Sequence, residues 1–315
     1  MRIGYLIIAH HLPGHLVRLV ERLDAPDTTF FIHFDATGSS EDHDEVVRHL
    51  GRRANVRLVA RHPCSWAGLG VVRGTLECMM AAVEDPAPPD YLILLSGQDY
   101  PVTSHSHLLR ELEEHAGEVI MQLFPLPHPK WLRGEGGWGF GGMTRFQLWW
   151  VRFAERPYPL PYDPYAEQGL AGRWSRLMQR FGPVRRFPGS LQPYGGSAFW
   201  VMPLECARHV VALTRSNPAF TRFFRFVFCP DEMFFHTLIG NSDWRNRVVR
   251  DGLHYMRWPR RDEGLDMSHP LLLTIDHLDQ IIASGQPFAR KFDPRVDTGV
   301  LDALNAHSRR VSADG

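Results

Sequence analysis

Short apolar runs alternate with amphipathic segments along the first 123 residues. The pattern predicts strands at 3–8, 28–34, 56–60, 91–95 and 119–123, separated by helices that end near residue 24, span 41–50 and 70–83, and run from Ser104 or Ser106 to about His115. This alternation predicts an α/β protein with a mostly parallel, doubly wound central sheet flanked by helices. Ligands bind beyond the carboxyl ends of the strands in such sheets. The prediction therefore places His10, Asp35, Ser65, Trp66 and Asp99 along one rim.

The periodicity breaks down between about residues 124 and 193, where Trp, Gly and Pro are frequent. The run from Gly134 to Gly142 contains the spacing G-x-G-x-x-G, but no strand precedes it and no helix follows, so a dinucleotide-binding motif is not indicated. One interpretation is a flexible loop that carries aromatic rings such as Trp131 and Trp138 over a cleft. The other is a plain surface loop.

Regular structure is predicted again from Gly195 and Gly196, which open a strand that ends near Met202. Helices follow at about 203–214 and from Pro230, then a strand-like segment at 253–258 and a short helix at 276–283. We therefore expect one domain over 1–306. It divides into a nucleotide-binding half (1–123), irregular acceptor-side loops (124–193) and an acceptor and catalytic half (194–306), and a disordered tail is expected at 307–315.

The segment that begins at Pro230 combines helix-start signals with two acids, Asp231 and Glu232. Proline suits the first position of a helix, and negative charge is favourable in the first turn. The apolar run after them predicts a buried helix, so a carboxylate at its mouth would be partly buried. Partial burial raises a carboxyl pKa toward working pH, which suits a general base. The alternative is that both acids only complement the helix dipole.

Composition narrows the class of protein. The chain has 315 residues, zero formal net charge and a pI near 7.3, so bulk charge indicates no nucleic-acid or membrane-surface partner. The four cysteines are far apart, which favours free thiols in a reducing compartment over a disulfide framework. No signal peptide and no apolar run of bilayer-spanning length is evident, so we expect a cytoplasmic protein without an integral membrane segment.

Several common chemistries lack their motifs. There is no H-E-x-x-H metal site, no G-x-S-x-G nucleophile elbow and no phosphate loop that ends in G-K-[ST]. We predict no metal site. Arg290 and Lys291 suit a diphosphate, because a guanidinium forks onto phosphate oxygens and an ammonium acts as a point charge. A solvated turn with incidental charges is the alternative.

The motifs together resemble glycosyltransferase family 14, which holds core-2/I-branching β-1,6-N-acetylglucosaminyltransferases and peptide O-xylosyltransferases. The matching segments occur in the family's order and cover about residues 3–293. They are Ile7–His11, Phe31–Asp35, Ser65–Trp66, Leu95–Pro101, Gly196–Phe199, Pro230–Glu232, Arg257–Trp258 and Phe288–Phe292. The family is similar in fold to the GT-A nucleotide-sugar transferases, lacks their D-x-D metal motif and works without a divalent ion.

The resemblance implies a donor site, an acceptor site and one catalytic base. Glu232 would be the base, Asp35 would hold uracil, and Asp99 and Tyr100 would lie beside the donor sugar. Arg290 and Lys291 would face the diphosphate, and Trp258 would border the acceptor. The remaining expected donor-site residues are Ala9, His10, Ser65 and Trp66, and the remaining acceptor-site residues are Trp131, Trp138, Gly196 and Ser197.

Two departures from the family pattern bear on this expectation. The branching enzymes carry a further arginine before the last helix, where this chain has Met267-Ser268-His269-Pro270. The candidates to substitute for it are Arg260, Arg261 and Arg290. We expect no Golgi anchor or stem of the kind that the animal enzymes carry, and therefore a bacterial-type cytoplasmic member.

The expected activity is inverting, metal-independent transfer of N-acetylglucosamine or xylose from a UDP-sugar to a glycan, peptide or small-molecule hydroxyl. Developing charge on UDP would be stabilised by fixed cations, with no cofactor. Two alternatives stay open at this point. One is a metal-dependent GT-A transferase that uses Asp99, and the other is a glycan-binding protein without catalysis, with tryptophans as stacking platforms.

Overall fold

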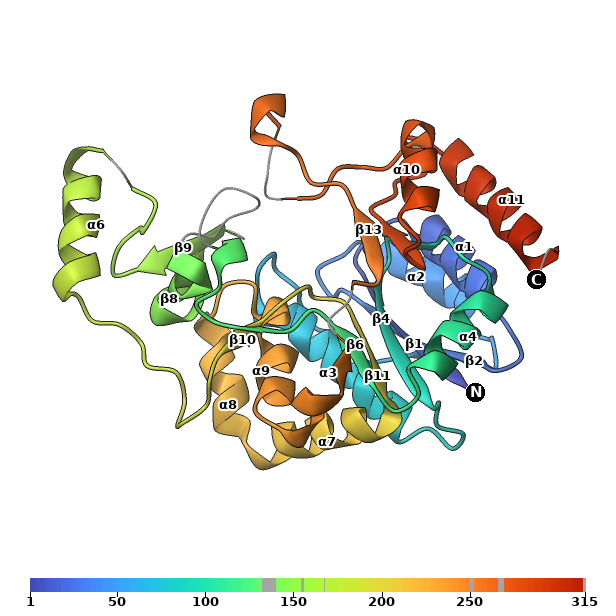
Figure 1. The fold of residues 1–315 in the computed structure, drawn as a ribbon, viewed down its shortest axis with the longest axis horizontal. Helices are drawn as coiled ribbons and strands as arrows, with labels where there is room; N and C mark the ends of the chain where they lie inside the picture. The colour runs from blue at the N-terminus through green and yellow to red at the C-terminus, as the bar shows by residue number, and fades with distance from the viewer. Residues whose placement is uncertain (132–139, 154–155, 167, 250–251, 266–268, 314–315) are drawn as a thin grey trace.

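The central layer of the molecule is a seven-stranded sheet (Figure 1). The computed structural model describes residues 1–131, 140–153, 156–166, 168–249, 252–265 and 269–313. The strand order is β12-β6-β11-β4-β1-β2-β3. The bounds are β1 Ile3–Ala9, β2 Thr28–Phe34, β3 Val56–Leu58, β4 Tyr91–Ser96, β6 Val119–Met121, β11 Trp200–Pro203 and β12 Val248–Val249.

The prediction of a mostly parallel sheet flanked by helices is confirmed. β1 pairs in parallel with both β2 and β4, so that Ile7 lies between Ile32 and Leu95. Only β11 runs against its neighbours among these strands, antiparallel to β4 and β6. Strands buried on both faces need continuous apolar sequence, which explains why β1 and β4 read as apolar runs.

Helices cover both faces of the sheet and enclose two apolar clusters. On one face, α1 (Pro13–Leu23), α2 (Ser40–Leu50), α4 (His105–Glu114) and α11 (Gly299–Ala313) contribute side chains to an apolar cluster that includes Tyr5 of β1. On the other face, α3 (Leu69–Val83), α7 (Leu204–Ser216) and α9 (Phe234–Gly240) pack against Leu6 and Phe31. Of the two predicted caps for α4, the one used is Ser104, whose hydroxyl accepts from His107 N at 3.2 Å.

A small three-stranded sheet joins two strands from the C-terminal part of the chain to the segment after β4. It consists of β13 (His254–Met256), β14 (Phe288–Arg290) and β5 (Tyr100–Pro101), with Ala289 opposite Tyr100. Residues almost 200 positions apart in sequence therefore lie side by side at the carboxyl edge of the central sheet.

Between residues 124 and 193 the chain is more regular than predicted. It forms a β8–β9 hairpin (Trp149–Phe153 and Arg156–Leu160) and a helix, α6 (Gly169–Phe181), which projects from the body at the left of Figure 1. The first part of this region pairs β7 (Phe124–Pro125) with β10 (Tyr194–Gly195). Residues 134–139 of the glycine-rich run, including Gly134, Gly136 and Gly139, lie outside the described residues.

Two predicted segments differ from the structure. The helix expected from Pro230 is divided: Pro230–Glu232 form a single 3₁₀ turn, Met233 leaves the helical region at φ −133°, and α9 begins at Phe234. The expected disordered tail is also wrong over 307–313, because these residues continue α11. No helix in the described part of the chain is long and apolar enough to cross a membrane.

The remaining elements are short. They are α5 Thr144–Gln147, α8 Pro218–Phe223, α10 Leu278–Ala283, and the 3₁₀ turns Pro129–Trp131, Phe140–Gly142, Phe224–Phe226, Asp243–Arg247, Arg261–Glu263 and Ile275–His277.

Candidate active site

The carboxyl ends of β1, β2 and β4 meet at one rim, as predicted from their parallel order. Asp35 N donates to Ala9 O at 2.8 Å, and Gly97 N donates to Ile8 O at 2.9 Å. A side chain at Gly97 would meet the Cβ of Ala9 at 2.7 Å, so only glycine lets the turn after β4 close on β1.

Asp35 organises the loop that carries Ser65 and Trp66. Its carboxylate oxygen Oδ1 accepts from Thr37 N at 2.8 Å and from Cys64 N at 3.0 Å. The carboxylate is nearly buried and fastens the end of β2 to the segment before α3. Trp66 extends from this loop with 42% exposure, edge-on to Phe228 and His269.

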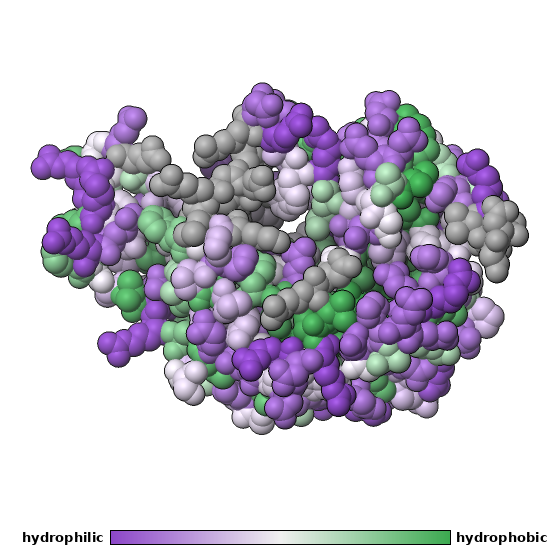
Figure 2. All heavy atoms as spheres, in the orientation of Figure 1, coloured by the Kyte–Doolittle hydropathy of each residue, from purple (hydrophilic) through white to green (hydrophobic). Residues whose placement is uncertain are grey.

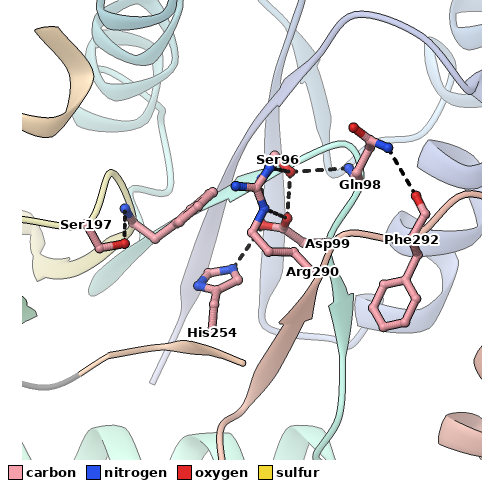
Figure 3. A network of polar contacts seen from close by, with 8 residues as sticks. Ser96, Gln98, Asp99, Ser197, His254, Arg290 and Phe292 are labelled. Carbon is pink, nitrogen blue, oxygen red and sulfur yellow. Dashed lines mark hydrogen bonds and ion pairs between the residues drawn. The ribbon is translucent and has the colours of Figure 1, made fainter. Parts of the chain in front are cut away.

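Asp99 is the centre of a buried polar network (Figure 3). Its carboxylate accepts from Ser96 N at 2.8 Å and from Arg290 Nε at 3.0 Å, and it contacts His254 Nε2 at 2.9 Å. Ser96 Oγ donates to it at 2.5 Å. The side chain has no exposed surface.

The environment of Asp99 stabilises its charged form. Burial alone raises the pKa of the carboxyl, but the charges of His254 and Arg290, with the hydrogen bonds from His254 and Ser96, outweigh burial and lower the pKa below its ordinary value. A carboxylate that is surrounded in this way positions Arg290 and offers little to a substrate. The structure thus disfavours Asp99 as a general base or as the exposed ligand of a metal.

Arg290 and Lys291 lie at the same rim. The guanidinium of Arg290 lies 4.6 Å from the ring centroid of Phe199 and remains partly exposed. Burial, the neighbouring His11, and the charges of Arg290 and Lys291 lower the pKa of His10 to about 4, against the opposing effect of Asp35. The imidazole of His10 is therefore neutral at physiological pH, and both cations lie within electrostatic range of it.

Glu232 lies in the turn before α9, paired with a buried arginine that the sequence did not indicate. Arg145 Nη1 donates to Glu232 Oε2 at 2.5 Å; the Arg145 side chain is 1% exposed and that of Glu232 is 30% exposed. The Arg145 guanidinium also lies 3.9 Å from the ring centroid of Trp131. Among the described residues, the second carboxylate oxygen, Oε1, has no hydrogen-bond partner.

Trp131 is less open than an acceptor platform would be. Arg145 covers one face of its ring, and a Cβ at Gly195 would lie 2.5 Å from the ring. Trp131 therefore supports the Arg145–Glu232 pair directly. Its role toward an acceptor stays a prediction.

The neighbouring acid, Asp231, is the one whose pKa is clearly raised. Burial and the negative charge of Glu232 raise the pKa of Asp231, against the lowering effects of a backbone hydrogen bond, Arg145 and Arg290. That the charge of Arg290 acts on Asp231 places the acidic turn and Arg290 within electrostatic range of one another. Gly196 N donates to Glu232 O at 3.1 Å, which attaches the turn to the segment before β11.

The other predicted site residues have the following positions. Ser197 Oγ accepts from Phe199 N at 3.4 Å beside the Asp99 network (Figure 3). Tyr100 is buried, and its hydroxyl donates to Asn305 Oδ1. Its ring therefore has a structural role behind the rim residues. Trp258 is 43% exposed after β13. Trp138 lies outside the described residues.

Two residues that matter at the site were missed by sequence reasoning, Arg145 and His254. Arg145 is 87 positions from Glu232 and His254 is 155 positions from Asp99, so no local spacing signals either contact.

Within the described ranges, no three His, Cys, Asp or Glu side chains are grouped closely enough to hold a metal ion. A cavity of about 600 Å³ between α1, α4 and α11 is lined by Arg22, His105 and Arg309, and none of the site residues lines it.

These features define an α/β protein whose polar site lies at the carboxyl ends of parallel strands. A family model described as "Core-2/I-Branching enzyme" matches residues 3–133 and 162–282, and the chain belongs to this family. The resemblance stated from the motifs is thereby confirmed.

Individual relatives are distant. The chain is 24% identical over 318 residues to "Beta-glucuronosyltransferase GlcAT14B" of Arabidopsis thaliana, covering 97% of this chain and 65% of the relative. It is 25% identical over 308 residues to "Xylosyltransferase oxt" of Drosophila pseudoobscura pseudoobscura, covering 90% of this chain and 30% of the relative. The chain thus spans less than two thirds of the length of these relatives.

Among solved structures, the galactosyltransferase LgtC in complex with donor and acceptor sugar analogues covers 98% of this chain and 96% of its own, at 10% identity and a TM-score of 0.43. The sheet topology of the chain itself defines its fold.

Proposed function

We propose that the protein is an inverting glycosyltransferase that moves a sugar from a UDP-sugar to an acceptor hydroxyl without a divalent ion. The observation that carries the proposal is the pairing of Glu232 with Arg145. One carboxylate oxygen is fixed by a buried guanidinium, and the other is left for an acceptor hydroxyl. Family membership supports a reaction of this class.

In the proposed reaction, Glu232 Oε1 takes the proton of the acceptor hydroxyl as its oxygen bonds to the anomeric carbon. The bond from that carbon to the diphosphate oxygen breaks, and UDP leaves with the electron pair. A single displacement converts an α-linked donor into a β-linked product. Arg145 holds the base in one orientation, which lowers the entropic cost of reaching the transition state.

The departing diphosphate needs fixed positive charge. Arg290 is positioned by Asp99 and Phe199, and Lys291 follows it at the rim. We propose that these two cations stabilise the β-phosphate as charge develops on it. Asp35 and Trp66, at the end of β2 and in the following loop, are proposed to hold the uridine.

The donor sugar is proposed to be N-acetylglucosamine, xylose or glucuronate, since relatives are named for the transfer of the last two. The direct test is slow donor hydrolysis, measured as UDP release from each UDP-sugar. Proton NMR then follows the anomer that forms first. We expect one donor to be preferred and the β-anomer to appear first from an α-linked donor. An α-anomer as the first product would overturn inversion, and no turnover of any donor would favour a glycan-binding protein.

A further inference from the structure

Helix α6 exposes an apolar stripe. Leu170, Trp174, Leu177 and Phe181 are 83%, 49%, 48% and 70% exposed. At 100° per residue they fall within an arc of about 60° on the helix. Exposed apolar residues normally occur singly, so four on one stripe of a helix indicate a binding surface.

The helix has two further faces. One face carries small buried residues, Gly172 and Ser175. Arg173, Arg176 and Arg180 are exposed and lie along one edge of the apolar stripe, within an arc of about 60°. Packed, apolar and basic faces therefore follow one another around α6.

The neighbouring β8–β9 hairpin adds to this surface. Trp149, Phe153, Tyr158 and Leu160 are 36–76% exposed. In the hairpin register, Trp149 lies opposite Leu160, and Val151 lies opposite Tyr158. Trp174 Nε1 donates to Pro161 O at 3.2 Å, which holds α6 beside the end of β9.

The charged side chains along this part of the chain are all positive. Residues 168–204 contain five arginines and no aspartate or glutamate, although the whole chain is neutral. Arg185 donates to the carbonyl oxygens of Leu148, Phe223 and Phe226 and so anchors the segment after α6 to the body. Purple and green side chains lie next to each other over the left margin of Figure 2, where Figure 1 places α6.

We propose that α6, with the outer face of the β8–β9 hairpin, docks on the surface of an anionic lipid bilayer. An apolar stripe of Leu, Trp and Phe bordered by arginines is the pattern of a helix that lies in the plane of a membrane interface. The apolar side chains enter the acyl boundary, and the arginines contact lipid phosphates. A second copy fits less well, because an antiparallel two-fold contact between the apolar stripes would bring the arginines of both copies to the same side.

The test is flotation of the full chain with vesicles of phosphatidylcholine alone or with one quarter phosphatidylglycerol, at low and at high salt. We expect binding to the anionic vesicles and weaker binding at high salt. Leu177→Gln with Phe181→Gln should reduce the bound-to-free ratio about tenfold or more. Arg173→Gln with Arg176→Gln should reduce it about tenfold on anionic vesicles only.

Matched controls are Val296→Gln, an exposed apolar residue elsewhere, and Arg48→Gln on α2. Both should bind like the wild type, and circular dichroism should show all variants folded. Wild-type chain that stays in the soluble fraction, or binding that the α6 variants leave unchanged, would overturn the proposal. So would a lipid-free dimer in light scattering that Leu177→Gln with Phe181→Gln dissociates. Donor hydrolysis without lipid, assayed in parallel, tests the catalytic proposal separately.

Discussion

The carboxylate of Glu232 is held at 2.5 Å from the guanidinium of Arg145, a side chain that is itself almost fully buried. Arg145 lies over Trp131, and the backbone of Gly196 binds the carbonyl oxygen of Glu232. Three segments from other parts of the chain thus hold this residue in place. A base held in this way needs little reorganisation when the acceptor arrives.

Arg145→Met should impair both catalysis and stability. The variant keeps an apolar stem beside Trp131 but loses the charge and the donor to Glu232. We expect the transfer rate to fall at least about tenfold because the carboxylate loses its orientation. We expect the free energy of unfolding to fall by about 1.5–3 kcal/mol, typical of a hydrogen bond to a charged group. Denaturant melts and UDP-release rates measure the two effects.

The matched control is Arg208→Met, which breaks a surface pair with Glu205 on α7. Exposed ion pairs contribute about 0–1 kcal/mol, so this variant should be nearly neutral. Equal effects of the two substitutions on rate would show that Arg145 does not position Glu232.

Asp231→Asn should stabilise the protein at neutral pH. Burial and the charge of Glu232 raise the pKa of Asp231 to about 7, so between pH 4 and 7 the folded state binds more protons than the unfolded state. This aspartate therefore costs stability as pH rises through that window. The variant should gain at least about 1 kcal/mol over the wild type at pH 8 and nothing at pH 3. Asp44→Asn, which removes an exposed carboxylate, is the matched control.

Asp99→Asn should destabilise the protein with the opposite pH dependence. Removing one partner of a buried pair costs about 3–5 kcal/mol. Because the pKa of Asp99 is lowered in the folded state, its contribution is complete above its ordinary value of 3.8 and is lost as pH falls through the lower folded value. The difference from the wild type should be constant from pH 5 to 8 and shrink in acid.

Asp302→Asn, which breaks the surface pair with Arg18, provides the comparison for Asp99→Asn. It should cost about 1 kcal/mol or less. An Asp99→Asn variant as stable as this control would contradict a structural role for Asp99.

How well the sequence predicts the structure depends on how far apart in the chain the contacting residues lie. Apolar runs and their spacing predicted β1, β2 and β4, since periodicity is a local signal. The reversed direction of β11 and the pairing of β14 with β5 are decided by contacts across the chain. The break at Met233 was missed because Asp231 and Glu232 look like an ordinary first helical turn, whereas the turn is bonded to Gly196 and Arg145 instead.

The site was predicted in the same uneven way. The rim with His10, Asp35 and Asp99 follows from parallel strand order, and the structure places these residues just after β1, β2 and β4. The prediction treated Arg290 as a cation for phosphate and did not foresee that Asp99 would bind it. A buried arginine such as Arg145 has no sequence signature of its own, because burial depends on which distant acid it meets.

Chelation should leave activity intact if fixed cations replace a metal. We expect UDP release to change by less than about twofold in EDTA, and added Mn²⁺ to have no larger effect, since in the proposed reaction Arg290 and Lys291 supply the charge that stabilises the leaving group. Loss of turnover in EDTA with recovery in Mn²⁺ would show that the reaction depends on a divalent ion.

The central claim is that Glu232 removes the acceptor proton, and the rate of Glu232→Gln on the preferred donor tests it most directly. Glutamine keeps the shape but cannot accept the proton, so the rate should fall about 10²–10⁴-fold. The affinity for UDP, measured by calorimetry, should stay close to that of the wild type. In the surface control Glu205→Gln, both the transfer rate and the UDP affinity should stay close to the wild-type values. A Glu232→Gln variant that binds UDP and transfers sugar at the wild-type rate would contradict the account.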